Sequence, residues 1–124
     1  MQIQAKQNKN TTPLSERLQA LLQDLQDHKA QDIVDLDIST QVGNFADHLL
    51  IATASSQRHA RSLADAVADL CHQQGYEYLR VEGYKEGQWI LVDLNDIVIN
   101  IFQAETRSLY RLEDLWGNIQ KGLA

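Results

Sequence analysis

Apolar residues at helical spacing near the start of the chain predict its first helix. Leucines recur at intervals of three and four residues from Leu14 to Leu25, which places them on one face of a helix. Thr12 is expected to cap this helix, and Pro13 suits its first position because the missing N–H would have no partner there. The pattern predicts a helix to about Lys29 whose leucine stripe faces the core. A partner-binding stripe is the alternative.

Short apolar runs between polar or glycine-containing segments predict five strands. The last two, at residues 89–94 and 97–102, are rich in β-branched and aromatic residues. The turn-forming pair Asn95-Asp96 joins them, which predicts a β-hairpin. The other strands are expected at residues 33–38, 48–53 and 78–82.

Two further helices are expected from capping residues and apolar spacing. Ser55 or Ser56 is a suitable N-cap for the second helix, and Gly75 is suited to a left-handed C-cap. Ser108 is expected to cap the third helix. Its apolar face would contain Leu112, Leu115, Trp116 and Ile119.

The element order α-β-β-α-β-β-β-α predicts one α/β domain with a mixed five-stranded sheet flanked by helices. One helical crossover leads from the second strand to the third, and helices are expected mainly on one face or partly on both. We assign the domain to residues 12–121. Residues 1–11 are polar and are expected to form a disordered tail, because they lack apolar surface to offset the entropy of ordering.

Composition narrows the functional classes. The 124 residues include 17 acidic and 11 basic side chains, a net charge of −6, which argues against a broad nucleic-acid-binding surface and leaves docking on a basic protein open. A single cysteine and the absence of a signal-peptide pattern indicate a reducing compartment, expected to be the cytoplasm. No apolar run approaches the roughly 20 residues of a membrane span.

Paired carboxylates support an enzymatic alternative. Asp35 and Asp37 share one side of a predicted strand, an arrangement in which nucleotidyl-transferring enzymes hold magnesium. The helix start at Ser55 and Ser56, with Arg58 nearby, offers a weak phosphate site. Acids that protect an edge strand, and a plain helix cap, are the favoured interpretations of these residues.

The remaining reactive side chains do not predict a metal site or another cofactor. The four histidines lack the spacing of a zinc site. They are His28, His48, His59 and His72. Cys71 lies on the apolar face of the second predicted helix, which favours a small buried side chain over a nucleophile.

The mouth of the hairpin is the strongest candidate for a contact surface, because charges and large aromatic residues stand beside two glycines. The residues are Glu82, Tyr84, Lys85, Glu86, Trp89 and Asp93. Aromatic residues dominate interface energies, so Tyr84 and Trp89 are expected to anchor a partner. The acidic side chains are expected to meet Lys or Arg on that partner. A core position covering the sheet is an equally favoured interpretation of Trp89.

Several segments, in unbroken order from about Leu14 to Trp116, resemble those of a known family. They are QDIVDLD from Gln31, Asp47 followed by LIATASSQRH and LADAV, VEG with the downstream Trp89 and VDLND, and ETRSLYRLEDLW. The last contains the unusual pattern Arg-x-x-Tyr-x-Leu-Glu-x-Leu-Trp from Arg107. Together they resemble the ribosomal silencing factor family, RsfS, also called the Iojap family.

This resemblance implies a small α/β domain similar in fold to nucleotidyltransferases, without established transferase activity. It also implies binding to the large ribosomal subunit through its basic protein fourteen. Joining with the small subunit is then blocked sterically, and translation is repressed when nutrients are scarce. The free protein is expected to be a homodimer. A nucleotidyltransferase-like enzyme that uses Asp35, Asp37 and magnesium is the alternative.

The chain departs from the family's usual residues at three positions. Ala54 and Asn95 stand where the family usually has Gly, and Asn100 stands where a His is common. Asn tolerates positive φ, so Asn95 is expected to keep the hairpin turn. Asn100 removes a titratable group, which argues against chemistry at that position.

Overall fold

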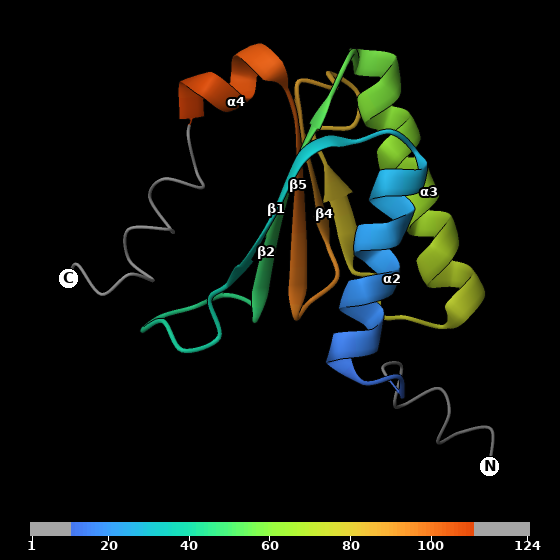
Figure 1. Ribbon diagram of the computed structural model, residues 1–124, viewed down its shortest axis with the longest axis vertical. Coiled ribbons are helices and arrows are strands. Elements are labelled where there is room, and N and C mark those ends of the chain that lie inside the picture. Colours follow the sequence, from blue (N-terminus) through green and yellow to red (C-terminus); the bar gives the residue numbers. More distant parts are fainter. Residues whose placement is uncertain (1–10, 111–124) are drawn as a thin grey trace.

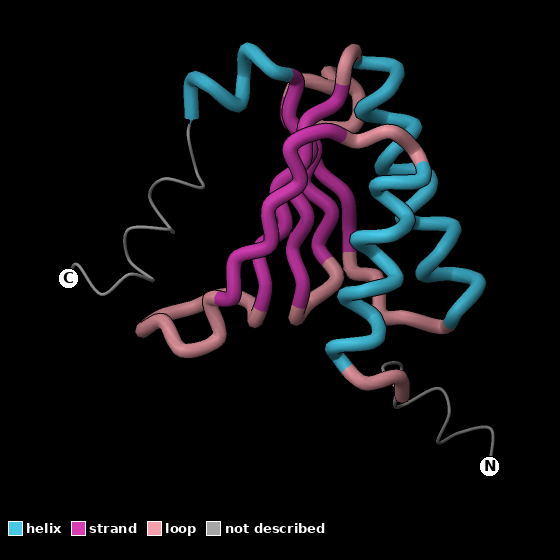
Figure 2. Tube along the Cα trace, viewed as in Figure 1, coloured by secondary structure: helices cyan, strands magenta, loops and turns pink. Residues whose placement is uncertain are grey.

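The structure is a computed structural model that describes residues 11–110, and Figures 1 and 2 show its helices and strands. The elements, in chain order, are α2 (Leu14–Asp27), β1 (Gln31–Asp37), β2 (His48–Ala54), α3 (Gln57–Gln74), β3 (Arg80–Glu82), β4 (Trp89–Asp93), β5 (Ile97–Gln103) and α4 (Ala104–Tyr110). The predicted order of helices and strands is confirmed. The predicted disordered tail, apart from Thr11, lies outside the described residues.

The strands form one mixed sheet in the order β1-β2-β5-β4-β3. β2 and β5 run parallel at its centre, and the other neighbouring strands are antiparallel. Helix α3 is the predicted crossover. It carries the chain from β2 to β3 at the far edge of the sheet, because the hairpin strands β4 and β5 lie between them.

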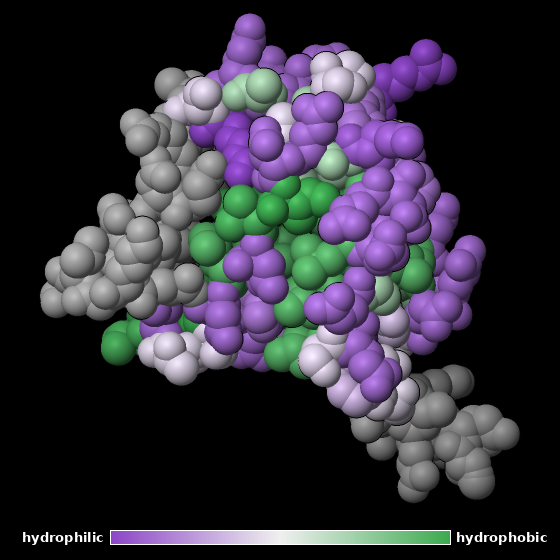
Figure 3. Space-filling view, in the orientation of Figure 1, coloured by the Kyte–Doolittle hydropathy of each residue, from purple (hydrophilic) through white to green (hydrophobic). Residues whose placement is uncertain are grey.

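Helices α2 and α3 cover one face of the sheet (Figure 1). Leu21 and Leu25 of α2 and Leu63 and Val67 of α3 are buried in one core with the inward side chains of β2, β4 and β5. The leucine stripe of α2 therefore belongs to the core. Each of its fully buried leucines stabilises the fold by about 1.5 to 3 kcal/mol. Figure 3 shows that the helices present a mainly polar surface, whereas apolar side chains gather over the sheet near β1. Among the described residues, no helix has the length and apolar character to cross a membrane.

The opposite face of the sheet has a second apolar cluster. It contains Leu36, Leu49, Ile51, Val98 and Phe102. Helix α4 packs against the ends of β5 and β2, and its Arg107 donates hydrogen bonds to Thr53 Oγ1 and to the carbonyl oxygen of Asp32. α4 begins directly after β5, so Ser108 lies inside the helix and the prediction that it caps this helix is wrong. The expected apolar face from Leu112 onward lies outside the described residues.

Capping was predicted correctly for α3 and wrongly for α2. Ser56 Oγ accepts a hydrogen bond from the backbone N–H of His59 at 3.0 Å, and Gly75 ends α3 in the left-handed conformation. At α2 the N-cap is Pro13, which makes no side-chain capping bond. Thr12 instead uses its backbone carbonyl, which accepts a hydrogen bond from Arg17 Nε at 2.9 Å.

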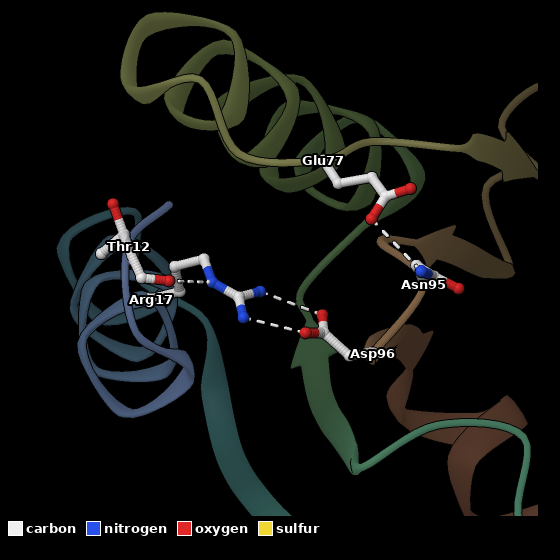
Figure 4. A network of polar contacts seen from close by, with 5 residues as sticks. All are labelled: Thr12, Arg17, Glu77, Asn95 and Asp96. Carbon is white, nitrogen blue, oxygen red and sulfur yellow. Dashed lines mark hydrogen bonds and ion pairs between the residues drawn. The ribbon is translucent and has the colours of Figure 1, made fainter. Parts of the chain in front are cut away.

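The turn between β4 and β5 is tied to helix α2 by an ion pair (Figure 4). Arg17 donates from Nη1 and Nη2 to the two carboxylate oxygens of Asp96, at 3.0 and 2.8 Å. The carbonyl oxygen of Asp96 also accepts from the N–H groups of Asp47 and His48. Asn95 has φ of 81°, which confirms that Asn keeps this turn. The turn therefore holds both α2 and the start of β2.

Strand β3 is shorter than the predicted strand at residues 78–82. Regular pairing begins at Arg80, although the N–H of Leu79 still donates to the carbonyl of Asp93 at 2.8 Å. Leu79 is about half exposed. At the edge of the sheet only one neighbour supplies hydrogen bonds, so the pairing of β3 ends early.

Candidate functional site

The outer half of the sheet brings together side chains from β3 and β4. Ile90 and Val92 point into the core beneath the helices, and because side chains alternate along a strand, the residues between and beside them face the other way. The register pairs Arg80 with Asp93 and Glu82 with Leu91, so these β3 side chains share that face. We call this surface the β3–β4 face. It consists of Arg80, Glu82, Trp89, Leu91 and Asp93.

Trp89 is both a packing residue and a surface residue. Its indole Nε1–H donates to Asn100 Oδ1 at 2.8 Å, and its ring lies 4.9 Å from the ring of Phe102. Asn100 is buried and Trp89 is half-buried. The Trp89 side chain is therefore held in place by Asn100 and Phe102, and part of it is accessible to solvent. Asn100 thus positions the tryptophan, a role that the sequence did not predict.

Arg80 joins two of the acidic residues that were expected to meet a partner. Its Nε donates to Glu82 Oε2 at 2.7 Å, and its Nη1 lies 2.7 Å from Asp93 Oδ2. These contacts, the hydrogen bond to Glu82 foremost, raise the pKa of Arg80 above its usual value. Asp93 also accepts a hydrogen bond from the backbone N–H of Asn95. Both acidic side chains of this face, Glu82 and Asp93, are therefore paired with the guanidinium of Arg80.

Residues 83–88 form a loop that leads from β3 to β4 and contacts helix α3. The Tyr84 hydroxyl donates to Asp65 Oδ2 at 3.0 Å, and this hydrogen bond raises the pKa of Tyr84. Trp89 lies on the face away from α3, so the two predicted anchors point to different sides. Lys85 and Glu86 are exposed between them.

Two glycines are required for the shape of this loop. Gly83 has φ of +77°, and an added Cβ would lie 2.2 Å from the carbonyl oxygen of Trp89. Gly87 has φ of +71°, and its Cβ would lie 3.2 Å from the side chain of Gln57. Side chains other than glycine rarely adopt such φ values. The loop therefore passes closer to β4 at Gly83 than a Cβ would allow, and at Gly87 it lies tightly against α3.

The sequence did not identify Arg80 and Arg61 as residues of this site. Arg61 is half-buried on α3 and donates to the carbonyl oxygens of Tyr84 and Lys85. The signal for Arg80 was its two-residue spacing from Glu82, because residues two apart on a strand share a face. Nothing in the sequence indicated that Arg61 approaches the loop, because that contact depends on how α3 crosses the sheet.

The residues of the enzymatic alternative are engaged separately. Asp35 Oδ1 lies 2.7 Å from His48 Nδ1. Asp37 accepts hydrogen bonds from the Ser39 hydroxyl and N–H, which hold the pKa of Asp37 below its usual value. Within residues 11–110, no three His, Cys, Asp or Glu side chains have an arrangement that could hold a metal ion.

The start of α3 is distant from these carboxylates. Asp35 pairs with Leu50 in β2, and Ser55 follows five residues later, about 16 Å along an extended strand. The N–H of Ser55 donates to His59 Nδ1, so His59 carries its proton on Nε2 and donates it to the carbonyl of His28. These groups link α3 to the end of α2 and do not converge with Asp35.

Cys71 is fully buried, as its place on the apolar helix face predicted. Burial raises the pKa of its thiol to about 12. Because the thiolate is the reactive form, the buried thiol is a poor nucleophile at neutral pH.

The fold and its surface define the class of the protein: a small mixed α/β domain whose outer sheet face combines a partly exposed tryptophan with an arginine and two carboxylates. The family model "Ribosomal silencing factor during starvation", RsfS, matches residues 11–122. The chain therefore belongs to the RsfS family.

Individual relatives agree with this assignment. Ribosomal silencing factor RsfS of Halalkalibacterium halodurans is 34% identical over 103 residues, which cover 83% of this chain and 87% of that protein. RsfS of Bacillus subtilis is 36% identical over 92 residues, covering 74% of this chain and 77% of that protein. A mouse relative, "Mitochondrial assembly of ribosomal large subunit protein 1", is 26% identical over 95 residues, covering 74% of this chain and 41% of that protein.

A solved structure supports the fold. The crystal structure of a Chromobacterium violaceum protein superposes with a TM-score of 0.81 at 29% identity, covering 86% of this chain and 88% of that chain. The α/β fold predicted from the sequence is confirmed.

Proposed function

We propose that this protein binds the large ribosomal subunit through the β3–β4 face and residues 83–88. Its partner there is the basic large-subunit protein fourteen, and the bound domain blocks joining with the small subunit. Translation is thereby repressed when nutrients are limiting. The protein acts in the cytoplasm without a cofactor and forms a homodimer when free.

One observation carries this proposal: Trp89 is held by Asn100 and Phe102 yet remains partly exposed within a charged rim. An immobilised aromatic side chain loses little conformational entropy on binding, which is why tryptophans often dominate interfaces. Glu82 and Glu86 supply acidic rim positions that suit a basic partner. A steric block needs occupied space rather than catalytic groups.

Sedimentation with purified large subunits tests this proposal directly. The protein is expected to co-sediment with isolated large subunits and not with assembled ribosomes, because joining covers the docking site. Co-sedimentation with both to the same extent would contradict a block to joining.

Trp89→Ala tests the anchor. Removal of an interface tryptophan is expected to weaken large-subunit binding at least about tenfold. Circular dichroism and urea unfolding must first show that the variant is folded, because Trp89 also packs on Phe102. A folded variant with unchanged affinity would remove Trp89 from the interface.

Charge reversal tests the rim. Glu82→Lys with Glu86→Lys is expected to slow association and to reduce its dependence on salt. The matched control is Glu16→Lys with Asp27→Lys, which changes the net charge equally at exposed positions of α2. An equal effect of both pairs would indicate a response to net charge alone.

The enzymatic alternative makes a different prediction. A nucleotidyltransferase that uses Asp35 and Asp37 would be stabilised by ATP with magnesium more than by magnesium alone. We expect no additional shift in melting temperature, and we expect Asp35→Ala to retain large-subunit binding. A nucleotide-dependent shift that Asp35→Ala abolishes would favour the enzyme.

A further inference from the structure

Helix α3 holds the 83–88 loop through Arg61. Its Nε donates to the carbonyl oxygen of Tyr84 at 3.1 Å, and its Nη2 donates to the carbonyl oxygen of Lys85 at 2.8 Å. A planar guanidinium that binds two successive carbonyls fixes the orientation of both peptide groups. The compact ammonium group of a lysine does not have this fork geometry. Arg61 therefore determines how the backbone at the tip of the loop lies.

Two other positions of α3 contact the same loop. Asp65 accepts a hydrogen bond from the hydroxyl of Tyr84 at 3.0 Å, and Gln57 lies against Gly87. Gln57, Arg61 and Asp65 are spaced by four residues, so they form one stripe along the helix. The first helical residue, the second turn and the third turn of α3 thus all contact the loop.

The loop is also closed on itself. The N–H of Gly87 donates to the carbonyl of Gly83 at 3.0 Å, and Gln103 Nε2 donates to the carbonyl of Gly87 at 3.0 Å. Fixing the backbone of one residue costs about 1 to 2 kcal/mol of conformational entropy. A loop that is already ordered before it meets a partner does not incur that cost on binding.

We infer that Arg61 is a positioning residue for docking. It holds residues 83–88 in the conformation in which the exposed Lys85 and Glu86 contact the partner, while its own Nε and Nη2 donate to the loop carbonyls. This inference rests on the proposed function. Helix α3 covers the side of the sheet opposite to the β3–β4 face, and by this inference it contributes to large-subunit binding through Arg61.

The test compares Arg61→Leu and Arg61→Lys with Arg58→Leu, which removes the same charge from an exposed position of α3. Binding to purified large subunits is measured by sedimentation, and amide hydrogen exchange is followed in residues 83–88. Arg61→Leu is expected to weaken binding about tenfold and to speed exchange at Gly87. Arg61→Lys should recover part of the affinity, and Arg58→Leu should match the wild type.

A double-mutant cycle separates positioning from a general loss of stability. Lys85→Ala with Glu86→Ala removes the loop side chains that contact the partner. If Arg61 acts through the loop, Arg61→Leu weakens binding much less in that background than in the wild type. Equal losses in the two backgrounds would overturn the inference.

The outcomes also distinguish this inference from the proposed function. If the wild type binds large subunits and folded Arg61→Leu binds with unchanged affinity, Arg61 has no positioning role and the proposed function stands. If the wild type does not bind, the proposed function and the inference both fall.

Discussion

Replacing Arg17 by Met is expected to destabilise the protein strongly, because it leaves the Asp96 carboxylate without its main partner. The two side chains are 7% and 24% exposed, and the pair is bidentate. Breaking a fully buried pair on one side costs about 3 to 5 kcal/mol. Asp96 can regain part of its hydration at 24% exposure, so we expect a loss of about 2 to 3 kcal/mol. Met retains most of the apolar stem of Arg17.

Urea unfolding followed by circular dichroism measures this loss, and the melting temperature should fall by about 10 °C or more. Gln19→Met on the exposed side of α2 is the control, with an expected change below about 0.5 kcal/mol. Asp96→Asn should also destabilise, and the double variant should lose clearly less than the sum of the single losses. Additive losses, or a change for Arg17→Met as small as the control, would refute the role of this ion pair.

Three further predictions concern the thiol, the loop and an acid-sensitive turn. Cys71 should resist an aromatic disulfide reagent at pH 8 in the folded protein and react in urea along the unfolding curve, since burial raises its pKa to about 12; rapid labelling without urea would contradict this. Gly83→Ala should lower the free energy of unfolding by at least about 1 kcal/mol more than Gly43→Ala, measured by urea unfolding. Both glycines have positive φ, but only at Gly83 would the added Cβ meet another atom, the carbonyl oxygen of Trp89. Equal losses in the two variants would contradict this close approach. Hydrogen bonds from Ser39 lower the pKa of Asp37 in the folded state. They therefore stabilise the folded protein at neutral pH, and this stabilisation is lost as the pH falls below 3.8. Ser39→Ala should therefore be less stable by under about 0.5 kcal/mol at pH 6 and equal to the wild type in strong acid.

Much of the fold could be predicted because its signals are local. The cap at Ser56, the left-handed Gly75 and the positive φ of Asn95 each depend on a few neighbouring residues. The cap of α4 could not be predicted, because that helix begins directly after β5 and leaves no separate capping residue at Ser108. Local patterns therefore predicted both ends of α3, whereas the start of α4 is determined by its direct connection to β5.

The candidate site was predictable only in part, because its arrangement depends on contacts between distant segments. The sequence placed Tyr84 and Trp89 five residues apart, but it did not show that one contacts α3 and the other lies on the opposite side of the sheet. The sequence predicted that Glu82 and Asp93 meet Lys or Arg of a partner, but it did not predict that both also contact Arg80. Their shared contact with Arg80 follows from the register of β3 and β4, which single-sequence patterns do not determine.

The ion pair between Arg17 and Asp96 has a consequence for the order in which the protein folds. The two residues are 79 positions apart, so α2 leaves the ribosomal exit tunnel long before its anchor has been made. Contacts of such high sequence separation close late, because loop-closure entropy opposes them until the rest of the sheet has formed. Of the described helices, the one that is synthesised first is therefore expected to dock last.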